Sequence, residues 1–320
     1  MPKLNASSRI MYQEAQARGI KCTTFGDDET ILMEYQGKSW YVRGSRTSLQ
    51  SSVGKTIADY KPLTKSVLQH FGLPTARGLA ISNTTELPQL SQLTFPLVMK
   101  PVDDRHGRGV HVGIKSIEEA TQLFTEYGKR VIFEEMLQGT EYRIVCVDYK
   151  FIAAAFRKPA FVTGDGTHTI TELVAEKNTH PWRGSGHENN LSLIEIDELV
   201  LEYLAEQNIT PESIPEAGRE VFLRKTANLS TGGEAWDVTD TVCAENRELF
   251  EKIAKACDLN VIGIDIMCQT LEQPITSQQN AGVIEVNASP GLRMHHFPMQ
   301  GKPQNIAKII LTMLMEAYAR

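Results

Sequence analysis

Three oxygen-bearing side chains stand out on two apolar segments near the carboxyl end of the chain. Asp265 interrupts the strand pattern of residues 261–268, and Glu285 and Asn287 lie two positions apart in the pattern of residues 282–287. Alternate residues of a strand share a face, so two such strands side by side would bring the three together. Carboxylate and amide oxygens suit magnesium held jointly by protein and nucleotide phosphates. Polar residues on an exposed strand face are the alternative.

A glycine-rich turn follows another strand pattern. The sequence "VDDRHGRGVHVG" occupies residues 102–113 and comes directly after Lys100-Pro101. Glycines let backbone amides approach a phosphate, and consecutive amides bind anions. A lysine at the end of a strand can reach a polyphosphate as a point charge. An ordinary hairpin turn preceded by a surface lysine explains the same residues, so the loop alone does not decide.

Two better-known phosphate motifs are excluded. Gly54-Lys55-Thr56 resembles the end of a P-loop, but Leu49 stands where the first glycine belongs. Gly107, Gly109 and Gly113 do not have the spacing of a dinucleotide-binding fingerprint.

The bulk composition narrows the class of protein. The chain has 320 residues, a net charge of −6 and five cysteines without a Cys-x-x-Cys pair. We expect reduced thiols and a cytoplasmic location, and neither a disulfide framework nor a zinc site. No apolar run has the length of a membrane span and no signal peptide is recognisable, so no membrane partner is expected. The negative charge argues against nucleic acid as a partner.

The elements that must position these residues alternate irregularly between helices and hairpins. Helix patterns cover residues 7–19, 61–71, 116–127, 246–257 and 306–318. Strand patterns cover residues 29–36, 38–43, 95–101, 131–133, 142–147, 151–157, 261–268 and 282–287. Residues 160–220 are polar, contain helix and are less regular. Antiparallel hairpins mixed with helices predict an α+β fold.

These motifs together resemble those of the ATP-grasp ligases. "VIFEEMLQGTEYRI" (131–144) resembles the nucleotide hinge of that family, "VMKP" (98–101) its second lysine strand and "VIEVNASPG" (283–291) its magnesium strand. Further segments are similar to the ATP-grasp part of cyanophycin synthetases: "SRTS" (45–48), "HGRGV" (106–110), "RKPAFVTGDGTHTITELV" (157–174), "RGSGHENNLSLIEID" (183–197), "LRKTANLSTGGEAWDVTD" (223–240) and "PGLRMH" (290–295). The resemblance runs from about residue 10 to the end.

The resemblance implies an ATP-grasp fold of the α+β class, with the nucleotide held between two lobes. Residues 1–60 would pack on the core, 61–133 would form the small lobe with the glycine-rich loop, and 134–320 the large lobe with the magnesium and substrate site. Two departures from the family pattern are visible. The Mur-ligase-like domain of cyanophycin synthetases is not recognisable, and Tyr60 stands where an acidic residue usually precedes Lys61.

Specific contacts to ATP and Mg²⁺ follow from the same resemblance. Lys61 and Lys100 would contact the phosphates, while His106, Gly107, Arg108 and Gly109 would close over them. Glu134 would accept from the adenine amino group, within the hinge that also contains Glu135. The Leu137 backbone would read the adenine ring edge, and Glu141 would bind the ribose. Asp265, Glu285 and Asn287 would hold magnesium.

The remaining motif residues imply a substrate site. Arg157 and Arg224 would contact the transferring phosphoryl group, Asn228 would lie at the substrate end, and Arg293 would bind a substrate carboxylate, because an arginine fork matches carboxylates and phosphates. Surface ion pairs are the alternative for each arginine. His187, His295 and His296 would either orient substrate or be structural.

The resulting hypothesis is an ADP-forming ligase that joins a carboxylate to an amine through an acyl phosphate, with amino-acid or short-peptide substrates. A ligase like glutathione synthetase, joining a γ-glutamyl peptide to an amino acid, is the second possibility. A catalytically degenerate nucleotide-binding partner or regulator is a third, of another class. The resemblance makes a homodimer plausible.

Overall fold

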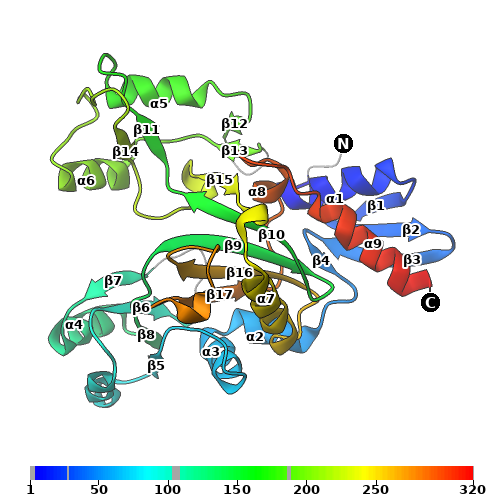
Figure 1. Cartoon of the computed structure of the whole chain (residues 1–320), viewed down its shortest axis with the longest axis horizontal. Helices are drawn as coiled ribbons and strands as arrows, with labels where there is room; N and C mark the ends of the chain where they lie inside the picture. The colour runs from blue at the N-terminus through cyan, green and yellow to red at the C-terminus, as the bar shows by residue number, and fades with distance from the viewer. Residues whose placement is uncertain (1–3, 27–28, 103–108, 186–188, 320) are drawn as a thin grey trace. The chain divides into compact units, whose positions relative to one another are not determined.

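The computed structural model describes residues 4–26, 29–102, 109–185 and 189–319 (Figure 1). The chain divides into two compact units. One comprises residues 49–152 and 240–290, and the other residues 1–48, 153–239 and 291–320. We refer to them as the nucleotide unit and the arginine unit, after the candidate residues that each contains. One boundary between them falls within strand β10 (Lys150–Lys158).

The nucleotide unit contains a four-stranded antiparallel sheet in the order β5-β8-β6-β7. Its strands are β5 (Gly78–Ile81), β6 (Leu97–Pro101), β7 (His111–Ile114) and β8 (Val131–Glu135). Helix α4 (Ile117–Tyr127) lies beside this sheet (Figure 1). This helix and the 3-10 helix η1 (Thr84–Gln92) share a buried apolar cluster with the sheet. Strands β6 and β8 are the inner strands, so side chains on their polar face have fixed neighbours on both sides.

A second antiparallel ladder in the same unit joins β9 (Thr140–Val147), β16 (Val261–Cys268) and β17 (Gly282–Asn287). Helices α2 (Ser52–Asp59), α3 (Lys61–His70) and α7 (Ala244–Ala256) pack around it (Figure 1). The short 3-10 helix η4 (Ile275–Ser277) lies in the connection between β16 and β17, whereas η3 (Thr239–Thr241) spans a boundary between the two units. The strands are almost entirely apolar on the buried face. A single charged residue on them therefore needs a partner or a function.

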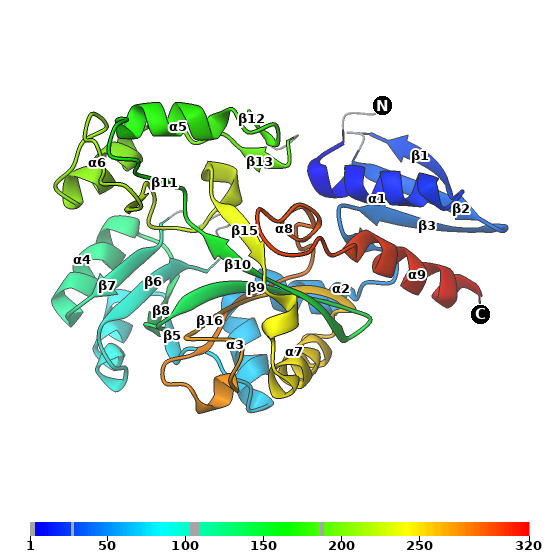
Figure 2. The ribbon, with the colours of Figure 1, turned by 45° about the horizontal axis from the view of Figure 1, so that its top comes forward.

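The arginine unit begins with helix α1 (Ala6–Ala17) and the antiparallel sheet β1-β2-β3-β4, whose strands are Lys21–Phe25, Thr30–Tyr35, Lys38–Arg43 and Arg46–Thr47. The terminal helix α9 (Ile306–Ala319) lies beside α1 and β3 (Figure 2). Trp40 stacks on Tyr318 with ring centroids 5.4 Å apart. The two ends of the chain therefore build one sub-structure.

The rest of the arginine unit contains two further apolar clusters. Its elements are β11 (Phe161–Thr163), α5 (Ile170–Asn178), β12 (Arg183–Gly184), β13 (Leu191–Ser192), α6 (Glu198–Glu206), β14 (Glu220–Phe222), η2 (Leu229–Thr231), β15 (Glu234–Asp237) and α8 (Arg293–His296). β12 and β13 are parallel, whereas β10 pairs with β15 and β11 with β14 in antiparallel fashion. The α+β fold class is confirmed.

Local signals explain why the predicted elements form where they do. Ser116 caps α4 by accepting from the Glu119 amide, and Gly128 ends the helix in the left-handed conformation. Gln36 and Gly37 both have positive φ, at 49° and 76°, which makes the tight turn between β2 and β3. Helix α2 and strand β1 were not predicted. Among the described residues, no helix combines the length and the apolarity needed to cross a membrane.

Candidate functional site

Lys100 and Glu134 are brought together by the register of the inner strands. Glu134 on β8 is opposite Val98, so Lys100, two residues along β6, is its diagonal neighbour on the same face. The Lys100 Nζ lies 2.7 Å from Glu134 Oε2. A second lysine, Lys65 on α3, places its Nζ 3.1 Å from Glu134 Oε1. One carboxylate therefore holds two ammonium groups.

The electrostatics of this trio follow from its burial. Only 4% of the Glu134 side chain is exposed. Burial would raise the pKa of the Glu134 carboxyl, but the attraction of Lys100 and Lys65 outweighs it and lowers that pKa below its ordinary value. Burial lowers the pKa of the Lys65 ammonium, which Glu134 opposes and Lys100 reinforces. The trio is thus a charged cluster with a carboxylate at its centre.

The predicted hinge follows β8. Glu135 accepts from the Thr94 amide at 2.9 Å and pairs with Arg77 at 3.4 Å. The amides on either side of Leu137 are bonded, Met136 N to Pro96 O and Gln138 N to Asn280 O. Leu137 itself makes no backbone hydrogen bond to any described residue. Its amide and carbonyl are therefore available to a planar ligand with donors and acceptors on its edge.

The three predicted metal ligands lie next to one another at the β16–β17 ladder. Asp265 and Glu285 are directly opposite in register, and the Asn287 amide donates to Glu285 Oε1 at 3.2 Å. Burial, and then the neighbouring Asp265 carboxylate, raise the pKa of Glu285. No cluster of three or more His, Cys, Asp or Glu that could hold a metal ion occurs within the described part of the chain.

Arg143 is an unpredicted member of this group. It lies opposite Asp265 on β9, is buried, and donates to both carboxylate oxygens, Nη2 to Oδ2 at 2.8 Å and Nε to Oδ1. One guanidinium and two carboxylates thus form a single row across three strands, and the Asn287 amide lies two positions further along β17. The oxygen donors fit a hard divalent cation, and Arg143 compensates the charge of Asp265.

The other predicted nucleotide residues are placed as follows. Lys61 is the first residue of α3, and Glu141 lies on β9 opposite Met267. Gly109 has a φ of +68°, and a Cβ there would lie 3.0 Å from the Pro101 ring. His106, Gly107 and Arg108 lie outside the described residues, as does His187.

The predicted arginines all belong to the arginine unit. Arg224 is 9% exposed, and its Nη2 donates to Asp197 Oδ2 at 2.6 Å, beside a cavity of about 120 Å³ that both residues line. Arg157 lies on β10 opposite Ala235. Arg293 begins α8 and donates to the Asn189 carbonyl at 2.8 Å. Arg224 is the arginine with a carboxylate partner beside a small polar cavity.

Asn228 begins the turn "NLSTGG" and its carbonyl receives the Thr231 and Gly233 amides. A Cβ at Gly233 would come within 2.8 Å of that carbonyl, so the turn requires glycine there. His295 is buried, and His296 accepts from the Ala307 amide through Nε2 at 3.3 Å. The accepting nitrogen requires a neutral imidazole, and burial lowers the pKa of His296 to about 4.

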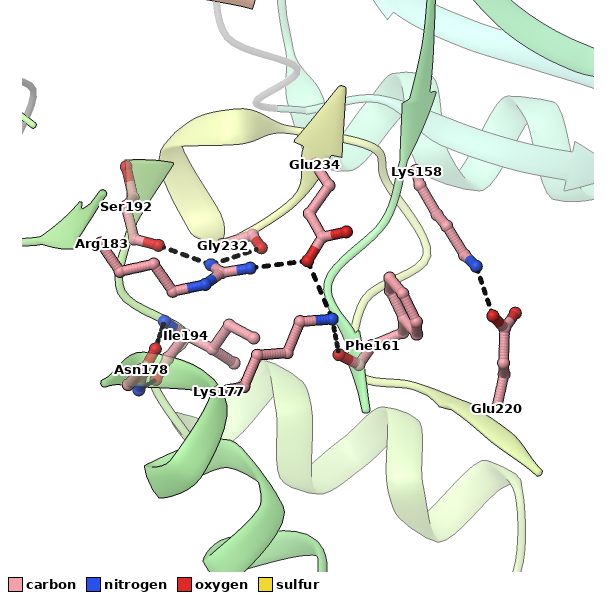
Figure 3. A network of polar contacts seen from close by, with 10 residues as sticks. All are labelled: Lys158, Phe161, Lys177, Asn178, Arg183, Ser192, Ile194, Glu220, Gly232 and Glu234. Carbon is pink, nitrogen blue, oxygen red and sulfur yellow. Dashed lines mark hydrogen bonds and ion pairs between the residues drawn. The ribbon is translucent and has the colours of Figure 1, made fainter. Parts of the chain in front are cut away.

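A buried network fixes the far side of this turn (Figure 3). Arg183 donates through Nη1 to the Ser192 and Gly232 carbonyls and through Nη2 to Glu234. Lys177 donates to the same Glu234 oxygen at 2.9 Å. Lys158 lies over the Phe161 ring and pairs with Glu220 (Figure 3). Arg183 therefore orders the glycine turn from behind, through Gly232 and Glu234.

The sequence did not single out Lys65, Arg143 or Arg183. Lys65 comes one helical turn after Lys61, and Arg143 is a lone charge on an apolar strand. Both features could have marked Lys65 and Arg143 as candidate site residues. Their partners Glu134 and Asp265 are distant in sequence, so the ion pairs could not be predicted.

Comparison with known proteins confirms the expected resemblance. Residues 217–314 match the model of the RimK-like ATP-grasp domain. The structure superimposes on the bifunctional glutathione synthetase from Pasteurella multocida with a TM-score of 0.80 and 30% identity, covering 99% of this chain and 44% of that one. The chain therefore has the ATP-grasp fold.

Proteins of similar sequence give the same result as the structural comparison. The chain is 35% identical to the cyanophycin synthetase of Synechocystis sp. over 97% of its own length and 36% of that protein. It is 34% identical to the glutathione biosynthesis bifunctional protein GshAB of Pasteurella multocida, over 97% of this chain and 42% of that protein. The chain thus spans less than half of the relatives it matches.

Proposed function

We propose that the protein is an ATP-dependent carboxylate–amine ligase that forms an amide bond between amino-acid or short-peptide substrates. The observation that carries the proposal is the pair of clusters in the nucleotide unit: Lys100 on Glu134, and Asp265 beside Glu285 and Asn287. A cation for phosphates and oxygen ligands for a metal are what a bound nucleotide triphosphate requires. The names of the relatives, cyanophycin synthetase and glutathione synthetase, support amide-forming chemistry.

The proposed reaction has two steps, and ATP is a substrate of the first. A substrate carboxylate attacks the γ-phosphate, which gives an acyl phosphate and ADP. An amine then attacks the carbonyl carbon, the amide forms, and phosphate leaves with the amine proton lost to solvent. A free carboxylate cannot accept the amine because it would have to expel oxide. Phosphorylation supplies the leaving group.

The residues have the following proposed roles. Lys100 and Lys61, with the loop at His106, Gly107, Arg108 and Gly109, hold the phosphates, and the hinge residues Glu134, Glu135, Leu137 and Glu141 hold the nucleoside. Arg157, Arg224, Asn228 and Arg293 bind the transferring group and the substrate. The positively charged side chains stabilise charge that develops on transfer.

Asp265, Glu285 and Asn287 would hold Mg²⁺, which would neutralise the charge of the nucleotide phosphates. Mg²⁺ usually takes one or two protein carboxylates and completes its shell with phosphates and waters. The set of two carboxylates and one amide fits that habit.

The experiment is phosphate release from ATP and Mg²⁺ with amino acids, dipeptides and aspartate-containing peptides offered in pairs. Release that needs two particular partners, with a product mass equal to their sum minus water, is the expected result. Lys100→Ala and Glu285→Ala should lose turnover while folded, whereas Lys150→Ala, which removes an exposed ion pair with Glu251, should keep it. ATP binding without turnover on any pair would favour a nucleotide-binding partner or regulator instead.

A ligase resembling glutathione synthetase is the second candidate, supported by the TM-score of 0.80 to the Pasteurella multocida structure. Turnover that requires a γ-glutamyl dipeptide and a single amino acid would favour it. Repeated addition to a peptide would favour the cyanophycin-like activity.

A further inference from the structure

The Lys65 ammonium is buried and fully used. The side chain is 8% exposed, and its three N–H groups have three partners: Glu134 Oε1 at 3.1 Å, the Ala76 carbonyl at 2.6 Å and Thr75 Oγ1 at 3.2 Å. An ammonium has three donors and no acceptor. No donor of Lys65 is left for a ligand, so a role in direct nucleotide contact is excluded by this geometry.

Lys100 is more exposed than Lys65 and has fewer hydrogen-bond partners among the described residues. Its side chain is 15% exposed, and its one hydrogen-bond partner among the described residues is Glu134. Two of its three donors thus have no partner among the described residues. Of the two lysines that share the carboxylate, only Lys100 is able to contact a phosphate.

The net charge of the trio Lys65, Lys100 and Glu134 indicates a role for Lys65. With Lys65 present, two cations share one carboxylate, and the trio carries a net charge of +1. Without Lys65, Glu134 and Lys100 would form a neutral pair, and the cation would have less attraction left for an anionic ligand. Occupation of Oε1 by Lys65 also turns Oε2 towards Lys100.

We propose that Lys65 is a positioning residue for the nucleotide site: it binds one oxygen of Glu134, fixes that carboxylate against Lys100, and leaves the trio with the positive charge that attracts the phosphates. The inference rests on the proposed function, because it assigns Lys100 to the nucleotide.

A second contact connects Lys65 to the metal strand. Thr75 Oγ1, which accepts from Lys65, donates to the Val283 carbonyl at 3.2 Å, and the Val283 amide bonds to Pro74. Val283 lies on β17, two residues before Glu285. Through Thr75, Lys65 thus ties the lysine cluster to the strand that carries a proposed metal ligand.

The test is the affinity for ADP with Mg²⁺, measured by calorimetry on the whole chain for four variants. Lys65→Met should weaken ADP binding by about tenfold or more, the scale of one charge-assisted hydrogen bond. Lys65→Met combined with Glu134→Gln should bind ADP better than Lys65→Met alone, because Lys100 regains an uncompensated charge. Lys100→Met should lose binding, and Lys150→Met, the exposed control, should match the wild type.

The outcomes separate the two hypotheses. Wild-type protein that does not bind ADP would overturn the proposed function. Binding that is lost in Lys100→Met but unchanged in folded Lys65→Met would overturn only the role of Lys65. So would a double variant weaker than Lys65→Met, because Glu134→Gln keeps an oxygen that can accept from the nucleoside and removes only the charge that holds Lys100.

A measurement on the wild type covers the case in which Lys65→Met does not fold. Acetylation of lysines, mapped by mass spectrometry, should modify Lys100 and be blocked there by ADP, whereas Lys65 should stay unmodified with and without ADP. Modification of Lys65 that ADP blocks would show direct contact and contradict the positioning role.

Discussion

Arg143 and Asp265 face each other on β9 and β16, and the guanidinium holds both oxygens of the carboxylate. On the other side of Asp265, Glu285 occupies the directly opposite position of β17. Directly opposite residues on neighbouring strands share a face and lie close together. A single arginine therefore compensates a site in which two carboxylates meet, and any divalent cation bound there shares Asp265 with it.

Arg143→Met tests whether Arg143 compensates the charge of Asp265 and Glu285. Removal of one partner from a buried ion pair costs about 3–5 kcal/mol, and here it also leaves two carboxylates facing each other. We expect a lower melting temperature, and a larger gain in stability on addition of MgCl₂ than the wild type shows, because the cation replaces the missing charge. Thermal unfolding with and without MgCl₂ measures both effects.

Arg77→Met provides the control for the Arg143 variant. Arg77 is 65% exposed in its pair with Glu135, so its loss should cost less than about 1 kcal/mol and leave the response to Mg²⁺ unchanged. An equal response of Arg143→Met and wild type to Mg²⁺ would contradict a cation site at Asp265 and Glu285.

The contributions of Arg183 and Glu234 to the stability of the arginine unit should be coupled. The Arg183 side chain is fully buried and makes bonds to two carbonyls besides Glu234. Arg183→Met should therefore cost about 3 kcal/mol or more. Lys177→Met should cost less, because Lys177 is 22% exposed and Arg183 still neutralises the carboxylate. Urea unfolding gives both values.

The double variant Arg183→Met with Glu234→Met tests the coupling directly. Its loss of stability should be smaller than the sum of the two single losses, because neither Arg183 nor Glu234 is left without the other, and Lys177 loses Glu234 equally in Glu234→Met alone. Additive losses would show that the two side chains act independently.

Much of this fold was predictable because the signals are local. The helix at α4 has its cap at Ser116 and its stop at Gly128, and the strands β16 and β17 are apolar runs bounded by turns. The strand β1, "KCTTF", has too few apolar residues to show its period, and it forms because β2 pairs with it. Local patterns therefore predict elements that have their own signal and miss those that depend on a neighbour.

The site was predictable to a different extent. Asp265, Glu285 and Asn287 were recognisable because polar groups interrupt apolar strands, and the register brings them together as expected. The partners of Lys65 and Arg143 were not, because Glu134 and Asp265 become their neighbours only through tertiary pairing. The sequence shows that a buried charge is present but not which group compensates it.

Gly139→Ala should be strongly destabilising. Gly139 precedes β9 with a φ of +118°, and a Cβ there would lie 2.3 Å from the Cys268 carbonyl oxygen. Both the backbone conformation and the contact exclude a side chain, so we expect a loss of more than about 3 kcal/mol. Gly37→Ala is the matched control: its φ is +76° but nothing lies within 4 Å, and strain alone should cost about 1 kcal/mol. Equal melting temperatures for the two variants would contradict the close approach at Cys268.

His296 should make the stability depend on pH below neutrality. Burial lowers its pKa from 6.5 to about 4. Between these values the unfolded chain binds a proton that the folded chain does not, so the free energy of unfolding falls as the pH decreases. For this one group the fall should be about 2 kcal/mol between about pH 7 and pH 5, by linkage.

The variant His296→Gln isolates that contribution, since its amide oxygen can still accept from the Ala307 amide while nothing at the position titrates. Urea unfolding at several pH values should give a shallower decline for His296→Gln than for the wild type. His70→Gln, at an exposed position at the end of α3, should leave the decline unchanged. If His296→Gln declines as steeply as the wild type, the imidazole is able to take up a proton in the folded protein, and the bond from Ala307 does not hold it neutral.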